Sequence, residues 1–222
     1  MSSSTCHDTA GMTRPAGPLR VGVIGAGRVG RKHGRAMRAL PEIVQVAAVC
    51  DVQRAAAEQM AAECGVGAEG VFGDAARLMR AGGVEAVALC TPHDEHFGQA
   101  MVAIAAGLHV LVEKPLALTM AEAEKVVEFA EVAGVTLMMG MNHRYDRRYR
   151  AVRERVAAGE IGAVREVRTA IALDVRPYAG SGHWVLDGAR AGGVVMELGW
   201  QKIDLLRWLG GPIARVTRVE LE

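Results

Sequence analysis

Short apolar runs alternate with longer amphipathic stretches from Leu19 to about Gly140. The runs, of which the third is weaker, are Arg20–Gly25, Val44–Cys50, Val71–Phe72, Val84–Cys90, His109–Val112 and Val135–Met139. Because they are apolar at consecutive positions, they predict strands that helices cover on both faces. The stretches between them predict helices over Arg28–Ala39, Arg54–Ala62, Asp74–Arg80, Glu95–Ala106 and Thr119–Ala133. This alternation predicts an α/β fold, with a doubly wound parallel sheet of the Rossmann type over residues 19–141.

The pattern changes after Gly140. It predicts a helix, a strand, an apolar helix and a last strand, over Arg147–Ala158, Val164–Val175, Val194–Leu209 and Ile213–Leu221. We therefore expect residues 142–222 to begin a second, α+β domain with a predominantly antiparallel, open sheet. Since a sheet of two strands is only marginally stable, this domain is predicted to be incomplete.

Composition limits the classes of protein that the chain can represent. Hydrophobic residues make up 50% of its 222 residues and the formal net charge is +1. These values are typical of a globular protein and argue against a nucleic-acid or membrane surface. No apolar run is long enough to span a membrane, and residues 1–18 read as a disordered leader without the apolar core of a signal peptide. A cytoplasmic protein is expected.

The four cysteines show no spacing typical of metal ligands. They are Cys6, Cys50, Cys64 and Cys90. Cys50 and Cys90 each end an apolar run, where a free cysteine usually behaves as a small buried hydrophobic residue. We therefore expect reduced thiols and no metal site.

A glycine-rich loop follows the first predicted strand and opens the first predicted helix. In it, Gly25 would make the tight turn, Gly27 would let the backbone approach a pyrophosphate, and Gly30 would let helix and strand pack closely. Asp51, at the end of the next strand, can bind the adenosine ribose hydroxyls. An acid there repels a 2′-phosphate, so NAD is favoured over NADP, although Arg54 could accommodate that phosphate. Asp51 could also simply cap the following helix.

Two further motifs end predicted strands. The first, Cys90-Thr91-Pro92-His93-Asp94-Glu95-His96, begins at the last residue of the run Val84–Cys90. The second, Glu113-Lys114-Pro115, follows the run His109–Val112. Strand ends of this kind point into the ligand crevice of an open α/β sheet. With the glycine loop, these motifs resemble the glucose–fructose oxidoreductase/inositol dehydrogenase/rhizopine catabolism (Gfo/Idh/MocA) family, nearly collinearly from Leu19 to Gly211. The resemblance implies an NAD-dependent oxidoreductase acting on a sugar, polyol or cyclitol hydroxyl.

The resemblance also implies which residues hold the cofactor. These are Gly25, Gly27, Arg28, Val29, Gly30, Asp51, Thr91, Pro92, His96, Glu113 and Lys114. Lys114 would lie beside the reacting carbon and act in catalysis. The alternative readings are that Lys114 is a surface lysine at a strand end and that His96 is an imidazole on a helix surface.

The last predicted helix departs from the family at its catalytic positions. The family carries Asp and, four residues on, His, where this chain has Glu197 and Gln201. With Asp204, these positions would share one helical face. An amide can hold a hydroxyl but cannot accept its proton. Three hypotheses remain: Lys114 alone exchanges the proton; His183, His143 or Glu197 has taken over; or the site has lost redox turnover and kept binding.

The remaining expectations concern the substrate and partners. The resemblance implies a substrate site built from Lys114, His183, Trp184, Glu197 and Gln201, with Arg176 and Tyr178 in the same loop. Trp184 and Trp200 could instead be core or interface residues. Family members assemble through the open face of the second domain's sheet, so a homo-oligomer is expected. They are also longer, so this chain is expected to be truncated at its C-terminal end. Two other functions stay open: an NAD-dependent glycosidase and a non-catalytic dinucleotide sensor.

Overall fold

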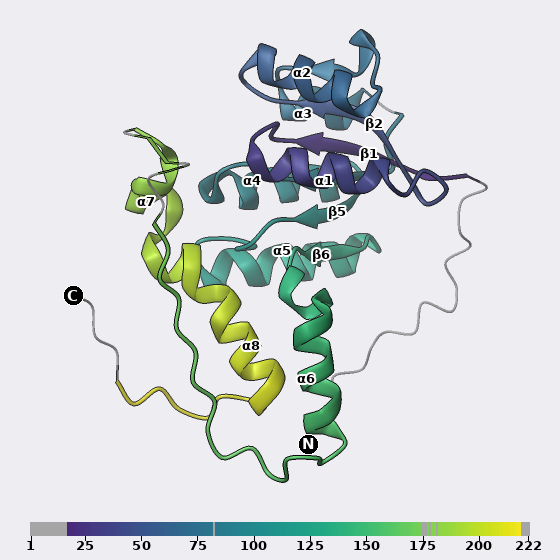
Figure 1. Ribbon diagram of the computed structural model, residues 1–222. Helices are drawn as coiled ribbons and strands as arrows, with labels where there is room; N and C mark the ends of the chain where they lie inside the picture. The colour runs from purple at the N-terminus through teal and green to yellow at the C-terminus, as the bar shows by residue number, and fades with distance from the viewer. Residues whose placement is uncertain (1–16, 82, 175–176, 178, 181, 219–222) are drawn as a thin grey trace.

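The computed structural model describes residues 17–81, 83–174, 177, 179–180 and 182–218. Within them, a six-stranded sheet has the order β3-β2-β1-β4-β5-β6, and every neighbouring pair is parallel (Figure 1). The strands are β1 (Leu19–Ile24), β2 (Val44–Cys50), β3 (Val71–Phe72), β4 (Ala86–Leu89), β5 (His109–Val112) and β6 (Leu137–Met139). The predicted parallel α/β sheet is confirmed.

Helices cover both faces of this sheet. They are α1 (Arg28–Arg38), α2 (Arg54–Cys64), α3 (Ala75–Arg80), α4 (His93–Ala105) and α5 (Met120–Ala133). The first two pack on one face and the other three on the opposite face. The predicted start of α4 at Glu95 is wrong, because the helix begins at His93, directly after Pro92. The helix therefore includes His93, and both His93 and His96, which are 3% and 0% exposed, lie on its buried side.

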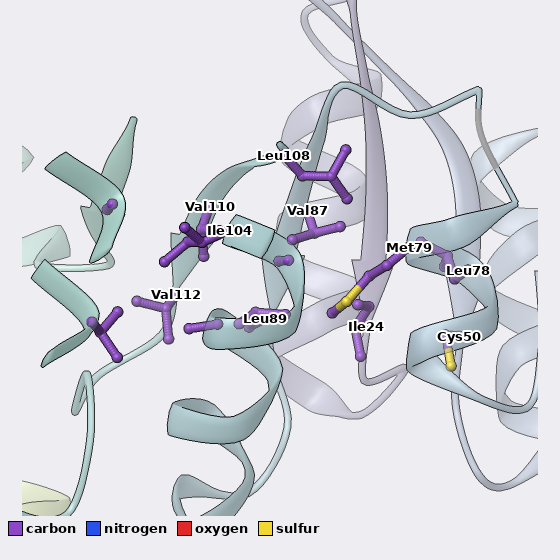
Figure 2. Close-up of a cluster of buried hydrophobic side chains, with 14 of the residues drawn as sticks. Ile24, Cys50, Leu78, Met79, Val87, Leu89, Ile104, Leu108, Val110 and Val112 are labelled. Carbon is purple, nitrogen blue, oxygen red and sulfur yellow. The ribbon is translucent and has the colours of Figure 1, made fainter. Parts of the chain in front are cut away.

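The core lies between the sheet and these helices (Figure 2). On the face covered by α3, α4 and α5, Leu78 and Ile104 pack against Val87 and Leu89 of the central strand β4. Each such fully buried aliphatic side chain contributes about 1.5–3 kcal/mol relative to an exposed one. This packing holds the carboxyl ends of the strands in fixed positions. No described helix is long and apolar enough to cross a bilayer.

Beyond β6, the regular elements that the structure describes are all helical. The elements are a 3₁₀ turn (Asn142–Tyr145), α6 (Arg147–Ala157), a second 3₁₀ turn (Trp184–Leu186), α7 (Gly188–Ala191), a π-helical turn (Val195–Gly199) and α8 (Trp200–Gly210). Helices α6 and α8 pack side by side below the sheet (Figure 1). The prediction of a single regular helix over Val194–Leu209 is wrong. The first part of this range is a π-helical turn centred on Glu197, and turns of this kind are frequent at functional sites.

The two strands predicted after Gly140 are not formed in the described parts of their ranges, 164–174 and 213–218. Alternating apolar residues make a strand only where a neighbouring strand completes the backbone ladder. The described residues of these segments have no such ladder partner, and Ile171 and Leu173 are 41% and 51% exposed. The antiparallel sheet of the second domain therefore stays a prediction. Residues 1–16 of the predicted leader lie outside the described residues.

Candidate active site

The carboxyl ends of β1, β2, β4 and β5 meet in one crevice, where the strand order reverses between β1 and β4. In open α/β sheets, ligands bind at such a switch point. Two cavities lie along this crevice. One, of about 410 Å³, is lined by Ala26, Gly27, Arg28, Arg31, Asp51, Gln53 and Ala56. The other, of about 170 Å³, is lined by Gly27, Arg28, Val29, Cys90, Thr91, His93, Glu113, Lys114, His183, Trp184, Val185 and Glu197.

The glycine-rich loop joins the two cavities, and its geometry requires glycine. Gly25 has φ +96°, and a Cβ there would lie 2.5 Å from the carbonyl oxygen of Cys90. A Cβ on Gly30 would lie 1.8 Å from the carbonyl oxygen of Gly25, so α1 can approach β1 only without a side chain. At Gly27, by contrast, a Cβ would meet open space. The first turn of α1 has no acidic residue and no capping side chain to compete with an anion.

Asp51 holds the wall of the larger cavity together. One carboxylate oxygen accepts a hydrogen bond from the backbone of Ala26 at 2.7 Å, and the other accepts one from the backbone of Gln53 at 2.8 Å. The capping position of α2 is Gln53, so Asp51 does not cap that helix directly. Its carboxylate instead links the loops after β1 and β2 and lines the cavity that the glycine loop opens.

In the smaller cavity, Lys114 and Glu197 meet from distant parts of the chain. The Nζ atom of Lys114 lies 3.0 Å from the Oε2 atom of Glu197 and 2.8 Å from its backbone oxygen. Their side chains are only 14% and 17% exposed. Lys114 is therefore not the free surface lysine of the alternative reading. Burial raises the pKa of Glu197, but the hydrogen bond from His93 and the charge of Lys114 outweigh it and hold this pKa below its ordinary value.

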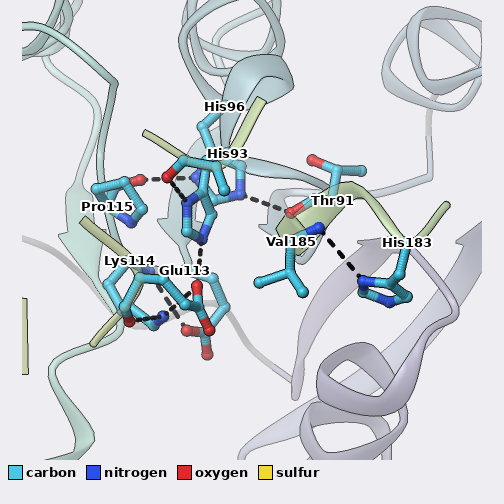
Figure 3. A network of polar contacts seen from close by, with 10 residues as sticks. Thr91, His93, His96, Glu113, Lys114, Pro115, His183 and Val185 are labelled. Carbon is cyan, nitrogen blue, oxygen red and sulfur yellow. Dashed lines mark hydrogen bonds and ion pairs between the residues drawn. The ribbon is translucent and has the colours of Figure 1, made fainter. Parts of the chain in front are cut away.

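His93 completes this cluster, and the sequence analysis gave it no role. Its Nε2 atom lies 3.2 Å from the Oε2 atom of Glu197, and its Nδ1–H donates to the backbone oxygen of Ala191 at 2.9 Å. The ring also packs edge-on against Trp184, with centroids 4.7 Å apart. Figure 3 shows His93 and Lys114 in the same network of polar contacts. The place of His93 directly after Thr91-Pro92, in a motif at a strand end, was the available signal.

His96 is a buried structural link. Its ring nitrogens lie 2.7 Å from the backbone oxygen of Pro115 and 3.0 Å from that of Thr91 (Figure 3). The reading of His96 as a helix-surface imidazole is therefore wrong. Burial lowers the pKa of His96 against the opposing effect of the Pro115 carbonyl. Neither His96 nor Pro92 lines either of the two cavities described above. His96 instead ties together the loops after β4 and β5.

Glu113 connects the same crevice to α1. Its Oε1 atom lies 2.7 Å from the Nε2 atom of His33, a residue that the sequence analysis did not consider. The carboxylate also packs so closely on Gly140 that a Cβ there would lie 3.2 Å from it. Burial raises the pKa of Glu113, but the hydrogen bond to His33 and the nearby Lys114 hold it below its ordinary value.

The structure separates the other residues predicted to share the catalytic helix face. Gln201 is half-buried on α8 but does not line either cavity. Asp204 points to the other side, where it accepts a bond from the Nε atom of Arg144 at 2.9 Å. His143 packs on Tyr149, with centroids 5.3 Å apart, and also lies outside the cavities. Of the sequence candidates for a substitute base, His183 and Glu197 line the smaller cavity.

The substrate loop is described only in part. His183 and Trp184 line the smaller cavity beside Lys114 and Glu197, as expected for a substrate site. Arg176 and Tyr178 lie outside the described residues. Cys50, Cys64 and Cys90 are free thiols. Among the residues that the structure describes, no group of three or more His, Cys, Asp and Glu side chains could hold a metal ion.

Comparison with protein families identifies two matching segments. Residues 19–141 match the model of an oxidoreductase family with an NAD-binding Rossmann fold, and residues 149–219 match the model of the GFO/IDH/MocA C-terminal domain. Among curated relatives, myo-inositol 2-dehydrogenase of Thermotoga maritima is 29% identical over 87% of this chain and 55% of its own length. The rhizopine catabolism protein MocA of Rhizobium meliloti is 33% identical over 87% of this chain and 57% of its own length.

Solved structures show the same likeness. The scyllo-inositol dehydrogenase of Lactobacillus casei, solved with bound NAD(H) and scyllo-inositol, matches with a TM-score of 0.77 and 26% identity over 87% of this chain and 56% of that one. An oxidoreductase domain protein of Kribbella flavida matches with a TM-score of 0.79 and 32% identity over 88% and 54%. The chain thus spans about half the length of the relatives that it matches.

Proposed function

Because the chain belongs to the GFO/IDH/MocA family of NAD-binding oxidoreductases, we propose that it serves as an NAD-dependent dehydrogenase of a cyclitol, polyol or sugar hydroxyl. The observation that carries this proposal is the contact of Lys114 with Glu197 at the end of the crevice. It puts a buried amine and a carboxylate beside the glycine-rich loop, where proton transfer and dinucleotide binding can be combined.

The described residues fit the dinucleotide. Gly27 leaves space for a pyrophosphate at the amino end of α1, and Gly25 and Gly30 hold the loop that makes this space. Asp51 would receive the adenosine ribose hydroxyls and repel a 2′-phosphate, which favours NAD over NADP. Arg28, Val29, Thr91 and Glu113 line the cavity at the other end, where the nicotinamide half would lie. Pro92 and His96 would shape this end from behind, since they hold the loop that presents Thr91.

The chemistry of the chain's own residues is proton transfer. Bound NAD would supply the acceptor for the hydride that leaves the carbinol carbon. As the carbonyl forms, the hydroxyl proton must leave, and the neutral amine of Lys114 would accept it. Glu197 would then stabilise the resulting ammonium at the distance seen here, 3.0 Å. Gln201 does not line this cavity, and its amide cannot act as a base. Its proposed part is therefore limited to holding a hydroxyl of a substrate that extends from the cavity toward α8.

The substrate class follows from the smaller cavity. Its wall combines donors and acceptors from Lys114, Glu197 and His183 with the flat ring of Trp184. Such a wall suits a hydroxylated ring, whose apolar face stacks on an aromatic side chain while its hydroxyls bond to polar groups. The inositols named for several relatives are therefore the first compounds to try.

The test is a panel of inositols, sugars and linear polyols with NAD and NADP, followed by the absorbance of the reduced cofactor. We expect turnover with NAD and at least one cyclic polyol, and turnover lower by about 10²- to 10⁴-fold in Lys114→Ala. Dinucleotide binding without turnover would contradict the proposal and favour a sensor. Cleavage of a glycoside without net NADH would indicate the glycosidase reaction instead.

We also propose that the protein assembles as a homo-oligomer through the second domain. The segments that would supply its sheet expose Ile171, Leu173, Ile213 and Val216 in this structure. Such apolar side chains are suited to burial against a second surface. Light scattering across a dilution series measures the assembly, and a monomer at all concentrations would contradict it.

A further inference from the structure

His93 is a buried histidine in the active-site cluster that the proposed chemistry leaves without a role. It is 3% exposed, yet it lines the smaller cavity with Lys114 and Glu197. A buried imidazole that faces a carboxylate at 3.2 Å can hold and release a proton. Its position therefore raises the question of where the proton taken up by Lys114 goes.

The hydrogen bonds of His93 determine which of its nitrogens can exchange a proton. Nδ1 lies 2.9 Å from the backbone oxygen of Ala191, which can only accept, so Nδ1 carries a hydrogen. Nε2 faces the Oε2 atom of Glu197, and two lone pairs at this distance would repel each other. A proton is therefore shared between Nε2 and Oε2. The same Oε2 atom accepts a hydrogen bond from Lys114, so it connects the amine to the imidazole.

We infer that His93 is the proton-relay residue of this site and supplies the imidazole that the Gln201 position lacks. This inference rests on the proposed dehydrogenase function. In each turnover, the O–H bond of the substrate breaks and an N–H bond forms on the neutral amine of Lys114. The proton shared by His93 and Glu197 then leaves to water in the cavity. The new proton on Lys114 crosses Oε2 to Nε2 and replaces it. Lys114 returns to the neutral amine, and one proton is released.

The other groups around His93 are already engaged. Its neighbour on α4, His96, lies with its ring centroid 5.8 Å away, but carbonyl oxygens occupy both of its ring nitrogens. Asp94, the next residue of the same helix, pairs with Arg190 at 2.8 Å. Trp184 contributes an uncharged ring edge.

Within the described residues, Glu113 and His183 also line the smaller cavity. Glu113 pairs with His33, however, and His183 accepts a hydrogen bond from the backbone of Val185. The carboxylate in contact with His93 is that of Glu197, which also binds Lys114.

The first test is His93→Gln, which removes the imidazole but keeps a polar side chain. We expect kcat to fall by about 10²-fold, at the low end of the range for acid–base groups. The affinity for NAD should change by less than about twofold, since a group that acts only on the proton does not contribute to cofactor binding. The pH profile of kcat should lose one of its limbs in this variant.

A rescue experiment separates a relay from a structural role. In His93→Ala, added imidazole should restore turnover, and a series of substituted imidazoles should do so according to their pKa. The matched control is His109→Gln, which removes an imidazole at the first residue of β5, at the other end of the strand from Lys114. It should keep kcat and the pH profile. The relay would be overturned if kcat falls in His93→Gln but its pH profile keeps both limbs and imidazole fails to restore turnover in His93→Ala.

A second readout does not depend on turnover. In protein with ¹⁵N-labelled histidine, we expect the Nε2 signal of His93 to titrate differently in Glu197→Gln and Lys114→Met than in the unmodified protein. An unchanged titration in both variants would overturn the inference, even if no substrate is found. If the unmodified protein is active and His93→Gln keeps both kcat and its pH profile, the inference fails while the dehydrogenase proposal stands. If the unmodified protein never reduces NAD, the dehydrogenase proposal fails, and the titration alone decides on the shared proton.

Discussion

The amine of Lys114 donates to both the side-chain and the backbone oxygen of Glu197, at 3.0 Å and 2.8 Å, across 83 positions of sequence. Lys114 follows the strand β5, and Glu197 lies in the π-helical turn before α8. This double contact therefore joins the parallel sheet to the helical part of the chain at the point where both line a cavity. A change at either residue affects the chemistry and the way the two parts meet.

The substitution Lys114→Ala should abolish most of the turnover while the protein still binds NAD. The reason is that the amine is proposed to accept the hydroxyl proton, a contribution of about 10²- to 10⁴-fold in typical acid–base catalysis. Steady-state kinetics measures the loss and fluorescence titration with NADH measures the binding. The matched control is Lys125→Ala on the exposed surface of α5. Full activity of Lys114→Ala would exclude this lysine as the proton acceptor.

The substitution Asp51→Ser should narrow the preference for NAD over NADP. It removes both the acceptor for the ribose hydroxyls and the charge that repels a 2′-phosphate. Because Asp51 also accepts hydrogen bonds from the backbone of Ala26 and Gln53, some loss of stability is expected as well. Asp51→Asn serves as a second variant, since it keeps an acceptor oxygen but not the charge. Equal affinity of the unmodified protein for the two cofactors would contradict the assignment.

The substitution Gln201→His should preserve or raise turnover if Gln201 only orients the substrate. The new imidazole would add a base on α8, and the pH–rate profile should gain a limb near its pKa, about 6.5 when unperturbed. In a sensor protein, the same change would leave turnover at background while NAD still binds. Loss of an existing activity would show instead that the hydrogen bonds of the amide are essential.

Because Glu113 pairs with His33, the free energy of unfolding should depend on pH. The folded protein holds the pKa of Glu113 below its ordinary value, so the folded state binds its proton less readily than the unfolded chain does. The stabilisation is therefore complete above the unfolded pKa, about 4.3, and is lost as the pH falls through the lower folded value. In urea unfolding, Glu113→Gln should have a lower free energy of unfolding than the unmodified protein at pH 6, and this difference should shrink toward pH 3. Glu124→Gln, exposed on α5, should show no such trend, and a constant difference in Glu113→Gln would contradict the linkage.

The local pattern of residues was sufficient to predict the parallel sheet, the alternation of its strands with helices, and the glycine-rich loop. These features depend on residues near one another in sequence: runs of Val, Ala and Leu for the strands, and Gly25 and Gly30 for a turn that admits no Cβ. The meeting of Thr91 and Lys114 in one crevice could be predicted too, because parallel strands bring their carboxyl ends to one edge.

Tertiary structure alone decided how the polar side chains pair. The contacts of His93 with Glu197 and of His33 with Glu113 depend on which segments of the chain pack against α4 and α1, and the local pattern of residues does not specify these neighbours. The π-helical turn separates Glu197 from the regular helix, so the spacing of Glu197, Gln201 and Asp204 did not make one shared face. Likewise, the alternating pattern of residues 164–175 and 213–221 did not show which strand each segment would pair with. A strand is completed only by a neighbour, and the alternation within one segment does not specify that neighbour.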